Sequence, residues 1–359
     1  MANSSSPRLI GDYEIEGRPL GSGGMATVHL VKKNGKKFAA KVLHKHLMRE
    51  RKTVERFKQE YAIGESMKTN TAFVSMHELF KHDGCWTIIM EFVPGITLQD
   101  ILNKLGPLNP KEAVAYIYEL SKALEQFHIK NYIHRDLKPC NIMITPAGLV
   151  KIMDYGVTRD LGSNITKTGT AVGTPLYMAP EQICGSKSTD CRCDIFSLGL
   201  IMYRLLSRKD AHGLSRNFEL IELVEARMKQ PIKPIKNIQD EPLIEVLEKA
   251  LAADPSDRFS DSKELCKAIE GLKTFSSNRK SIIKKMLKTI ESDSNKKPKK
   301  IDIDRTIVQN PGKKLLRKLV LISALAALFA AGFALLVMGP DKFFESIKGF
   351  IAQYFDLKN

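Results

Sequence analysis

The chain has 359 residues, of which 43% are hydrophobic and 27% charged, and a formal net charge of +16. That length is enough for one large domain or two ordinary ones, with an ample hydrophobic core. The six cysteines are scattered without a repeated metal-ligand spacing, which argues against a zinc site and indicates free thiols in a reducing cytosol.

The positive charge is concentrated in one stretch near the C-terminus. Residues 273–318 hold 15 Lys or Arg against four acids, a net charge of +11 that leaves +5 for the rest of the chain. A basic linker therefore explains the high isoelectric point, and we expect no nucleic-acid partner. Residues 1–7 are polar, and their lack of an apolar core predicts no signal peptide.

Residues 8–93 alternate in short strands around a glycine-rich turn. Strands are predicted over 13–20 and 28–33, and the turn between them carries Gly21, Ser22, Gly23, Gly24 and Met25. Glycines lack a Cβ atom, so backbone N–H groups in this turn can approach phosphate oxygens closely. The turn alone is a weak signal, because glycines often serve only to reverse the chain.

Lys41 strengthens the phosphate-binding interpretation. It lies in the mostly apolar strand predicted over 37–43, which follows the Asn34-Gly35 hairpin signal. Burying an ammonium group is costly unless it meets an anion, and ATP phosphates are the expected anion here. The helix predicted over 53–68 offers three glutamates that could hold Lys41 in place: Glu55, Glu60 and Glu65.

The central motif follows a helix predicted over 111–130 from its apolar period, and reads His134-Arg135-Asp136-Leu137-Lys138-Pro139-Cys140-Asn141. Phosphoryl transfer needs the three groups that it contains: a carboxylate to accept a hydroxyl proton, a cation for the transferred group, and an amide oxygen for Mg²⁺. A second carboxylate, Asp154, follows a predicted strand over 149–153.

This motif set resembles the catalytic loop of the eukaryotic-type protein kinases. The Gly-Gly-Met-Ala turn at 23–26 and the Met-Ala-Pro-Glu-Gln sequence at 178–182 are most similar to the bacterial Hanks-type serine/threonine kinases. The resemblance spans residues 11–272. It implies an α+β fold with two lobes: a small antiparallel β lobe with one helix over residues 8–93, and a larger, mainly α lobe over residues 94–275.

The resemblance also implies roles for single residues. Asp136 is expected to orient or deprotonate the hydroxyl, and Lys138 to stabilise charge on the phosphoryl group. Asn141 and Asp154 are expected to hold Mg²⁺, with Mn²⁺ as an alternative. Lys41 is expected to bind the α- and β-phosphates of ATP. Around the adenine the resemblance implies the hinge residues Glu91 and Val93, the gatekeeper Met90, and Val28, Ala39 and Met143 above and below the base.

Two positions in the small lobe and one in the larger lobe need comment. Glu60 occupies the position of the glutamate that pairs with the ATP-binding lysine, although Glu55 and Glu65 remain alternatives from sequence alone. Gly64 stands where larger residues are common, so we expect its helix to pack loosely. Tyr155 replaces the usual Phe after the second aspartate, and its hydroxyl needs a hydrogen-bond partner if it is buried.

The segment between Asp154 and Glu181 is rich in Thr and Gly, and it resembles an activation segment. Arg135 gives a guanidinium group that could pair with a phosphothreonine on this segment. We expect autophosphorylation at Thr168 and Thr170, with Thr166 as a further candidate. The family pattern also places Thr174 in the substrate groove, Asp194 behind the catalytic loop, and Arg258 in a pair with Glu181.

The C-terminal part predicts a tether and a membrane span. Residues 276–318 are expected to form a basic juxtamembrane linker, and residues 319–338 are 20 consecutive uncharged residues, about 30 Å long as a helix. Because basic residues precede the span, the positive-inside rule places the kinase in the cytoplasm and the tail, residues 339–359, outside. The aromatic residues of this tail fall on one helical face, which suits either the outer leaflet or a partner's membrane domain.

Together these features predict a single-pass, membrane-anchored serine/threonine protein kinase that uses ATP and Mg²⁺ to phosphorylate protein substrates in signalling. A homodimer that phosphorylates itself in trans fits the same prediction. Two alternatives stay open. A pseudokinase scaffold would be expected to have lost Lys41, Asp136 or Asp154, and none is missing; a small-molecule phosphotransferase shares the chemistry, but Ala179-Pro180-Glu181 argues against it.

Overall fold

The computed structural model describes residues 8–155, 175–185, 189–214, 218, 220–236 and 238–294. The chain divides into two units, residues 1–301 and 302–359, and all described residues belong to the first. Several predicted features therefore lie outside the described residues: Thr166, Thr168, Thr170 and Thr174, the transmembrane helix 319–338 and the tail 339–359.

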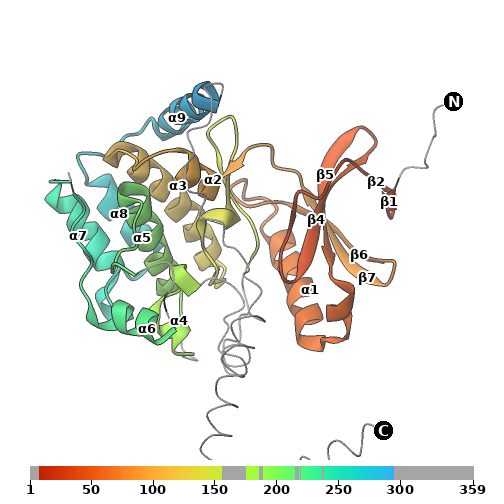
Figure 1. Ribbon diagram of the computed structural model, residues 1–359, viewed down its shortest axis with the longest axis horizontal. Helices are drawn as coiled ribbons and strands as arrows, with labels where there is room; N and C mark the ends of the chain where they lie inside the picture. The colour runs from red at the N-terminus through yellow and green to blue at the C-terminus, as the bar shows by residue number, and fades with distance from the viewer. Residues whose placement is uncertain are drawn as a thin grey trace, which may run out of the picture. The chain divides into compact units, whose positions relative to one another are not determined.

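A curled antiparallel sheet forms the N-terminal lobe (Figure 1). Its strand order is β1-β2-β4-β5-β7-β6, with β3 paired to β4. The strands are β1 (Leu9–Ile10), β2 (Tyr13–Ile15), β3 (Gly21–Ser22), β4 (Ala26–Lys33), β5 (Lys36–Leu43), β6 (Met76–His82) and β7 (Cys85–Glu91). The predicted strand 13–20 is interrupted, because Gly17 adopts φ +70° and Pro19 lacks a backbone N–H.

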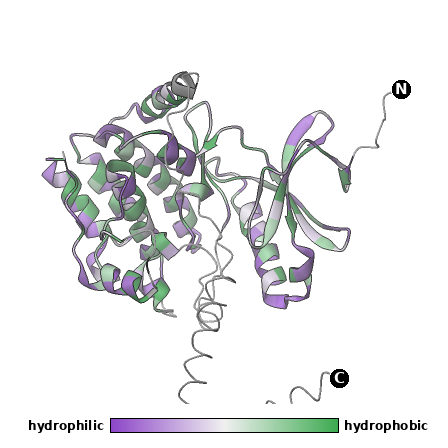
Figure 2. Ribbon diagram, in the orientation of Figure 1, coloured by the Kyte–Doolittle hydropathy of each residue, from purple (hydrophilic) through white to green (hydrophobic). Residues whose placement is uncertain are grey.

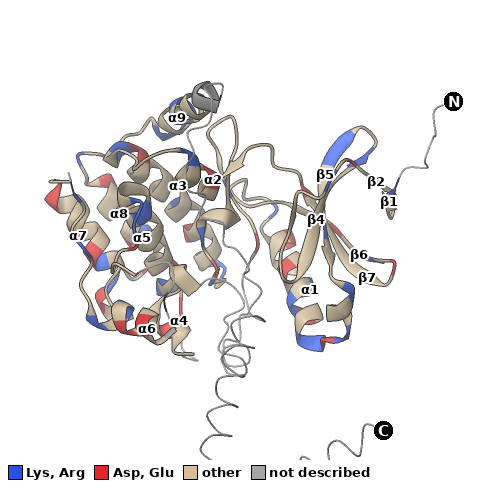
Figure 3. Ribbon diagram, viewed as in Figure 1, with Lys and Arg blue, Asp and Glu red and all other residues tan. Residues whose placement is uncertain are grey.

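The two hairpin turns of this lobe follow their sequence signals. Asn34 and Gly35 have φ values of 50° and 76°, and Asp83 and Gly84 have 47° and 77°. Two successive residues with positive φ are the requirement of a type I′ turn, whose twist matches that of paired strands. Figure 3 shows Lys and Arg gathered at the β4–β5 turn.

Helix α1 (Arg51–Ser66) contacts the sheet through β6 and β7. Its buried residues are Phe57, Glu60, Ile63 and Gly64, spaced so that they share one face. The loose packing expected at Gly64 is wrong. A Cβ atom there would lie 2.2 Å from Met76 Cγ and 2.9 Å from Tyr155 Cε2, so the glycine is required by close packing.

The C-terminal lobe is mainly helical and is built around α3 (Pro110–Ile129), which packs against α5 (Arg192–Ser207), α8 (Ser262–Glu270) and α9 (Arg279–Ser294). Hydrophobic residues dominate α5 in Figure 2. The other helices are α2 (Leu98–Lys104), α4 (Pro180–Ile183), α6 (Leu220–Lys229) and α7 (Glu241–Ala250), with 3₁₀ turns η1 (Lys45–Arg49), η2 (Pro139–Asn141), η4 (Pro175–Tyr177) and η5 (Pro255–Asp257). A small antiparallel sheet joins β8 (Ile96–Thr97), β9 (Ile142–Ile144) and β10 (Val150–Ile152).

Helix α9 differs from the prediction, because its residues were expected to belong to a solvated linker beginning at 276. Ile283, Met286, Leu287 and Ile290 recur at helical spacing and are buried in the main core. Arg279 Nε also donates a hydrogen bond to Glu119 of α3 at 2.7 Å. The folded unit therefore extends at least to the end of this helix.

None of the helices in the described part of the chain combines the length and the apolar character that crossing a membrane requires.

Candidate active site

Lys41 of β5 bridges two carboxylates from distant parts of the chain. Its Nζ donates to Glu60 Oε1 at 2.6 Å and to Asp154 Oδ1 at 2.7 Å. Of the three glutamates considered from sequence, Glu60 is the one that reaches Lys41, because it lies on the buried face of α1, whereas Glu55 pairs with the exposed Arg51. This contact joins β5, α1 and Asp154, the second residue after β10 (Val150–Ile152).

The three groups perturb one another strongly. Burial alone lowers the pKa of Lys41, but attraction by Asp154 and Glu60 outweighs it and raises that pKa. Attraction by Lys41 lowers the pKa of Asp154 despite burial, whereas burial raises the pKa of Glu60 to about 7. Two carboxylates share one ammonium group here, so an additional cation beside Asp154 is electrostatically favoured.

The catalytic-loop residues form a second connected group. Lys138 Nζ lies 2.9 Å from Asp136 Oδ2, and Asn141 Nδ2 donates to the Asp136 carbonyl at 3.0 Å. Asp194, fully buried in α5, holds the preceding loop by accepting hydrogen bonds from the backbone N–H groups of His134 and Arg135, each at 2.8 Å. Asp194 therefore fixes the first residues of the loop from the core of the helical lobe.

Asn141 and Asp154 lie at the same end of the β9–β10 hairpin. Ile142 pairs with Ile152, and the Met153 N–H donates to the Asn141 carbonyl at 2.8 Å. Because the Asn141 Nδ2 group is held by Asp136, its Oδ1 is the atom directed to other partners, of which the described residues supply only a weak thiol contact at 3.6 Å. One amide and one carboxylate oxygen suit Mg²⁺, which usually completes its shell with water and substrate phosphates.

Strand register aligns the residues predicted to surround the nucleotide. Gly21 pairs with Val28, Val28 with Lys41, and Ala39 with Met90. No described residue would come within 4 Å of a Cβ atom added to Gly21 or Gly24, so the backbone of the glycine-rich turn is open to a ligand. Met143 lies in β9, one residue along from the Ile142–Ile152 pair.

Comparison with known proteins identifies this arrangement. The profile of the protein kinase domain family matches residues 14–296. The chain belongs to the protein kinase family. Over 273 residues it is 33% identical to the serine/threonine-protein kinase PknB of Mycobacterium tuberculosis, a match that covers 73% of this chain and 43% of the relative.

Two other similar proteins are also serine/threonine-protein kinases. The serine/threonine-protein kinase PrkC of Bacillus subtilis is 30% identical over 267 residues, covering 72% of this chain and 40% of the relative. The serine/threonine-protein kinase pkn2 of Myxococcus xanthus is 38% identical over 212 residues, a match that covers 56% of this chain and 25% of the relative. The chain thus matches less than half the length of these relatives.

Glu91, predicted to lie in the hinge, is anchored by a residue to which the sequence did not point. Lys151 of β10 is buried and its Nζ lies 2.7 Å from the Glu91 carboxylate, which also accepts from the Ser75 N–H at 3.2 Å. The Glu91 N–H donates to the Ser75 carbonyl at 2.9 Å, so that N–H is engaged within the protein. In the sequence Lys151 looks like any other lysine of a strand. No residue near it indicates that it pairs with Glu91, which lies 60 positions away.

Tyr155 is also held more firmly than its sequence position suggests. Its hydroxyl donates to the Val74 carbonyl at 2.9 Å, and burial raises its pKa. Its ring stacks on Phe73 and Phe127, with centroids 5.7 Å and 6.1 Å apart. The tyrosine hydroxyl therefore has the partner that burial demands, and the residue directly after Asp154 is fixed from several sides.

The end of the predicted activation segment is tied to both the catalytic loop and the helical core. Arg258 is buried and donates to both oxygens of Glu181, at 2.8 Å and 2.9 Å. Gln182 Nε2 donates to the Arg135 carbonyl at 3.0 Å. The pairing of Arg258 with Glu181 was expected from sequence, but the bond from Gln182 was not, since a single glutamine carries no such signal.

Proposed function

We propose that this chain is a serine/threonine protein kinase that transfers the γ-phosphoryl group of ATP to serine and threonine hydroxyls of proteins. The observation that carries the proposal is the convergence of Lys41, Glu60 and Asp154, with both carboxylates within 2.7 Å of the same ammonium nitrogen. The family membership and the serine/threonine kinases among the relatives support it.

In this proposal the nucleotide is held by the small lobe. Lys41, positioned by Glu60, binds the α- and β-phosphates, and the backbone of Gly21 to Gly24 covers them. Ala39, Val28, Met90 and Met143 enclose the adenine, and the backbone at Glu91 and Val93 supplies its hydrogen bonds. The Lys151–Glu91 ion pair keeps the hinge in register with β10.

The catalytic loop then acts on the accepting hydroxyl. Asp136 orients the hydroxyl and takes its proton, while Lys138, 2.9 Å from Asp136, stabilises charge on the transferred group. Asn141 Oδ1 and Asp154 are the proposed ligands of Mg²⁺ or Mn²⁺. When bound, the metal neutralises charge on the β- and γ-phosphate oxygens. The short bonds among Asp136, Lys138 and Asn141 hold these groups in place before substrate binds.

We also infer that the kinase regulates itself through its activation segment. The Arg135 guanidinium donates to the Thr189 carbonyl at 3.4 Å, but its buried Nε meets no hydrogen-bond acceptor among the described residues. A phosphate on Thr168 or Thr170, or on Thr166, would supply one. A homodimer gives a route for phosphorylation in trans.

Membrane anchoring is the remaining part of the proposal. It rests on the 20 uncharged residues of 319–338 and the basic residues that precede them. With one span there, the kinase lobes face the cytoplasm and residues 339–359 the opposite side. Because α9 packs on α3, the linker of this arrangement begins after α9.

The test is transfer from ³²P-labelled Mg·ATP by the full chain, with phosphothreonine and phosphoserine mapped by mass spectrometry. Asp136→Asn and Lys41→Met are each expected to reduce transfer at least about 10²-fold. Asp83→Asn, in an exposed turn, and Lys36→Met, exposed in the same strand as Lys41, are the matched controls. Labelling of small molecules but not protein would point to a small-molecule phosphotransferase, and no labelling with either metal to a scaffold.

A further inference from the structure

The charges on the solvent-exposed side of α9 are all positive over residues 279–290, which hold five Lys or Arg and no acid. Its four lysines are exposed and spaced so that they share one side of the helix: Lys280, Lys284, Lys285 and Lys288. None of their ammonium groups takes part in an ion pair within the described residues. These four lysines form the basic face of α9, and its charge is not neutralised by that part of the chain.

The opposite side of α9 holds the helix in one orientation. Four of its apolar side chains are buried in the main core, and Arg279 is paired with Glu119 of α3 at 2.7 Å. A Cβ atom on Gly148, in the turn between β9 and β10, would lie 2.6 Å from the Lys280 carbonyl oxygen. The helix therefore fits closely against two elements of the lobe, and the basic face stays directed outward.

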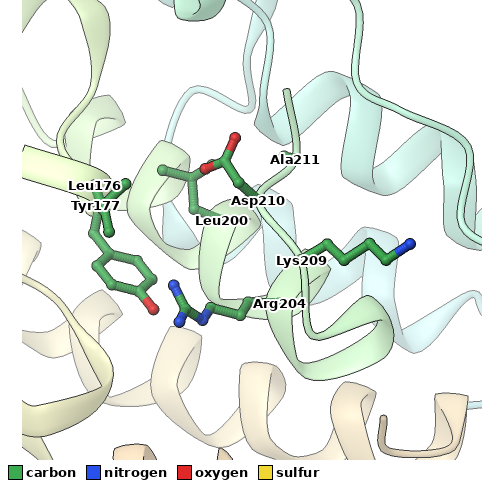
Figure 4. Close-up of a pocket in the computed structure, with 7 residues that line it drawn as sticks. All are labelled: Leu176, Tyr177, Leu200, Arg204, Lys209, Asp210 and Ala211. Carbon is green, nitrogen blue, oxygen red and sulfur yellow. The ribbon is translucent and has the colours of Figure 1, made fainter. Parts of the chain in front are cut away.

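Charges of both signs stand together elsewhere on the C-terminal lobe. Lys209 and Arg204 line a small hollow beside η4 together with Asp210, and Lys249 of α7 pairs with Glu264 of α8 at 2.7 Å (Figure 4). Helix α9 lies at the outer edge of the lobe, as Figure 3 shows. Its basic face therefore offers its charge to a partner outside the lobe.

The chain leaves the described residues at the end of α9, on the way to the predicted membrane span. Residues 295–318 separate this helix from residue 319, where the 20 uncharged residues begin. These 24 residues hold nine Lys or Arg and two acids, a net charge of +7. Even fully extended they reach only about 80 Å. With the span inserted, α9 is kept near the cytoplasmic leaflet, whose anionic lipids give it a negative surface potential.

We propose that the basic face of α9 docks on the anionic lipid headgroups of the cytoplasmic leaflet. The inference rests on the proposed membrane anchoring and deepens it by assigning a lipid-binding surface to the kinase domain itself. Each lysine near such a surface strengthens the attachment by about fivefold, and the four act together because the helix holds them on one side. Because α9 packs on α3 and on the β9–β10 turn, docking orients the C-terminal lobe relative to the membrane.

The test uses the full chain inserted into lipid nanodiscs and measures how fast each lysine is acetylated, with the modified sites mapped by mass spectrometry. Discs of phosphatidylcholine alone are compared with discs of equimolar phosphatidylcholine and phosphatidylglycerol. In the anionic discs the lysines of the basic face should react at least about fivefold more slowly. Salt at about 1 M, which shortens the screening length to about 3 Å, should restore their reactivity. Lys36 and Lys229, exposed on β5 and α6, should react equally in both kinds of disc.

A triple variant separates the basic face from the basic linker that follows it. It replaces three of the four lysines by glutamine: Lys284→Gln, Lys285→Gln and Lys288→Gln. The linker keeps all its charges, but the protection of Lys280 in the anionic discs should fall below about twofold. The matched control replaces three exposed lysines of other elements and should protect Lys280 as the wild type does: Lys36→Gln, Lys45→Gln and Lys229→Gln. All six positions are exposed, so neither variant is expected to disturb folding.

The outcomes separate this inference from the anchoring on which it rests. Equal reactivity of the basic face in neutral and anionic discs overturns the docking surface while the anchoring stands. Undiminished protection of Lys280 in the triple variant does the same, because the linker alone would then account for it. Insertion is measured separately, as co-elution of the chain with lipid in the neutral discs. If the chain does not co-elute, the proposed anchoring fails and the docking surface with it.

Discussion

Replacing Gly64 by alanine tests how tightly α1 is fitted against the residue that follows Asp154. On helix propensity alone, glycine to alanine inside a helix should stabilise the protein by about 1 kcal/mol. The new methyl group, however, would lie 2.2 Å from Met76 Cγ and 2.9 Å from Tyr155 Cε2, both far inside van der Waals contact. Forcing such an atom into a packed core typically costs about 1–3 kcal/mol.

We expect the cost of overpacking to exceed the gain in helix propensity, because neither neighbouring side chain can move without losing contacts of its own. Met76 Cγ is not the flexible end of its side chain, and Tyr155 is held by its hydrogen bond to Val74 and by two stacked rings. We therefore expect Gly64→Ala to lower the free energy of unfolding by roughly 1–2 kcal/mol. Any relaxation moves either α1, which carries Glu60, or Tyr155, which adjoins Asp154, so transfer activity should fall as well.

A double-mutant cycle in urea makes this prediction quantitative. In a Met76→Ala background the contact at 2.2 Å is gone and only the contact with Tyr155 Cε2 at 2.9 Å remains, so adding Gly64→Ala should cost less than it does in the wild type. The difference between the two backgrounds is the measured cost of the contact. If Gly64→Ala alone is more stable than wild type by the full helix-propensity gain, the close packing of this helix is wrong.

Three further predictions concern stability. Tyr155→Phe removes only the hydroxyl bonded to Val74, and leaving that carbonyl unpaired should cost about 1–2 kcal/mol in denaturant melts; an unchanged melt would mean that the bond is not formed in solution. Arg258→Ala leaves the Glu181 carboxylate without its buried partner and should cost about 3–5 kcal/mol, whereas a loss below 1 kcal/mol would show the pair to be dispensable. Burial lowers the pKa of His212 to about 4, so the unfolded chain binds a proton that the folded chain does not, and stability should fall by at most about 3 kcal/mol as the pH drops from 6.5 to 4. His212→Gln should remove that part of the pH dependence, and an identical pH profile in both proteins would contradict it.

Much of the small lobe could be predicted because its signals are local. The Asn34-Gly35 and Asp83-Gly84 pairs require positive φ, and both turns have it. The catalytic loop could likewise be recognised from one run of eight residues. The choice among three glutamates was harder, since helical spacing alone does not say which face is buried, and it took the family pattern to favour Glu60.

Other features depended on partners far away in the chain. The Lys151–Glu91 pair and the bond from Tyr155 to Val74 join residues separated by 60 and 81 positions, and neither pair has a local signal. The packing at Gly64 depends on two side chains from outside its helix. Helix α9 is a different case: Ile283, Met286, Leu287 and Ile290 have helical spacing, but the many lysines around them made the segment resemble a solvated linker.

The arrangement of Lys41 is tested most directly by isothermal titration calorimetry of the full chain with ATP, with and without Mg²⁺. If Lys41, Glu60 and Asp154 converge on a metal-bound triphosphate, the wild type should bind ATP more tightly when Mg²⁺ is present. Lys41→Met should weaken binding about tenfold or more, and Lys36→Met should not. Failure of the wild type to bind ATP under either condition, or equal affinity in Lys41→Met, would contradict the account.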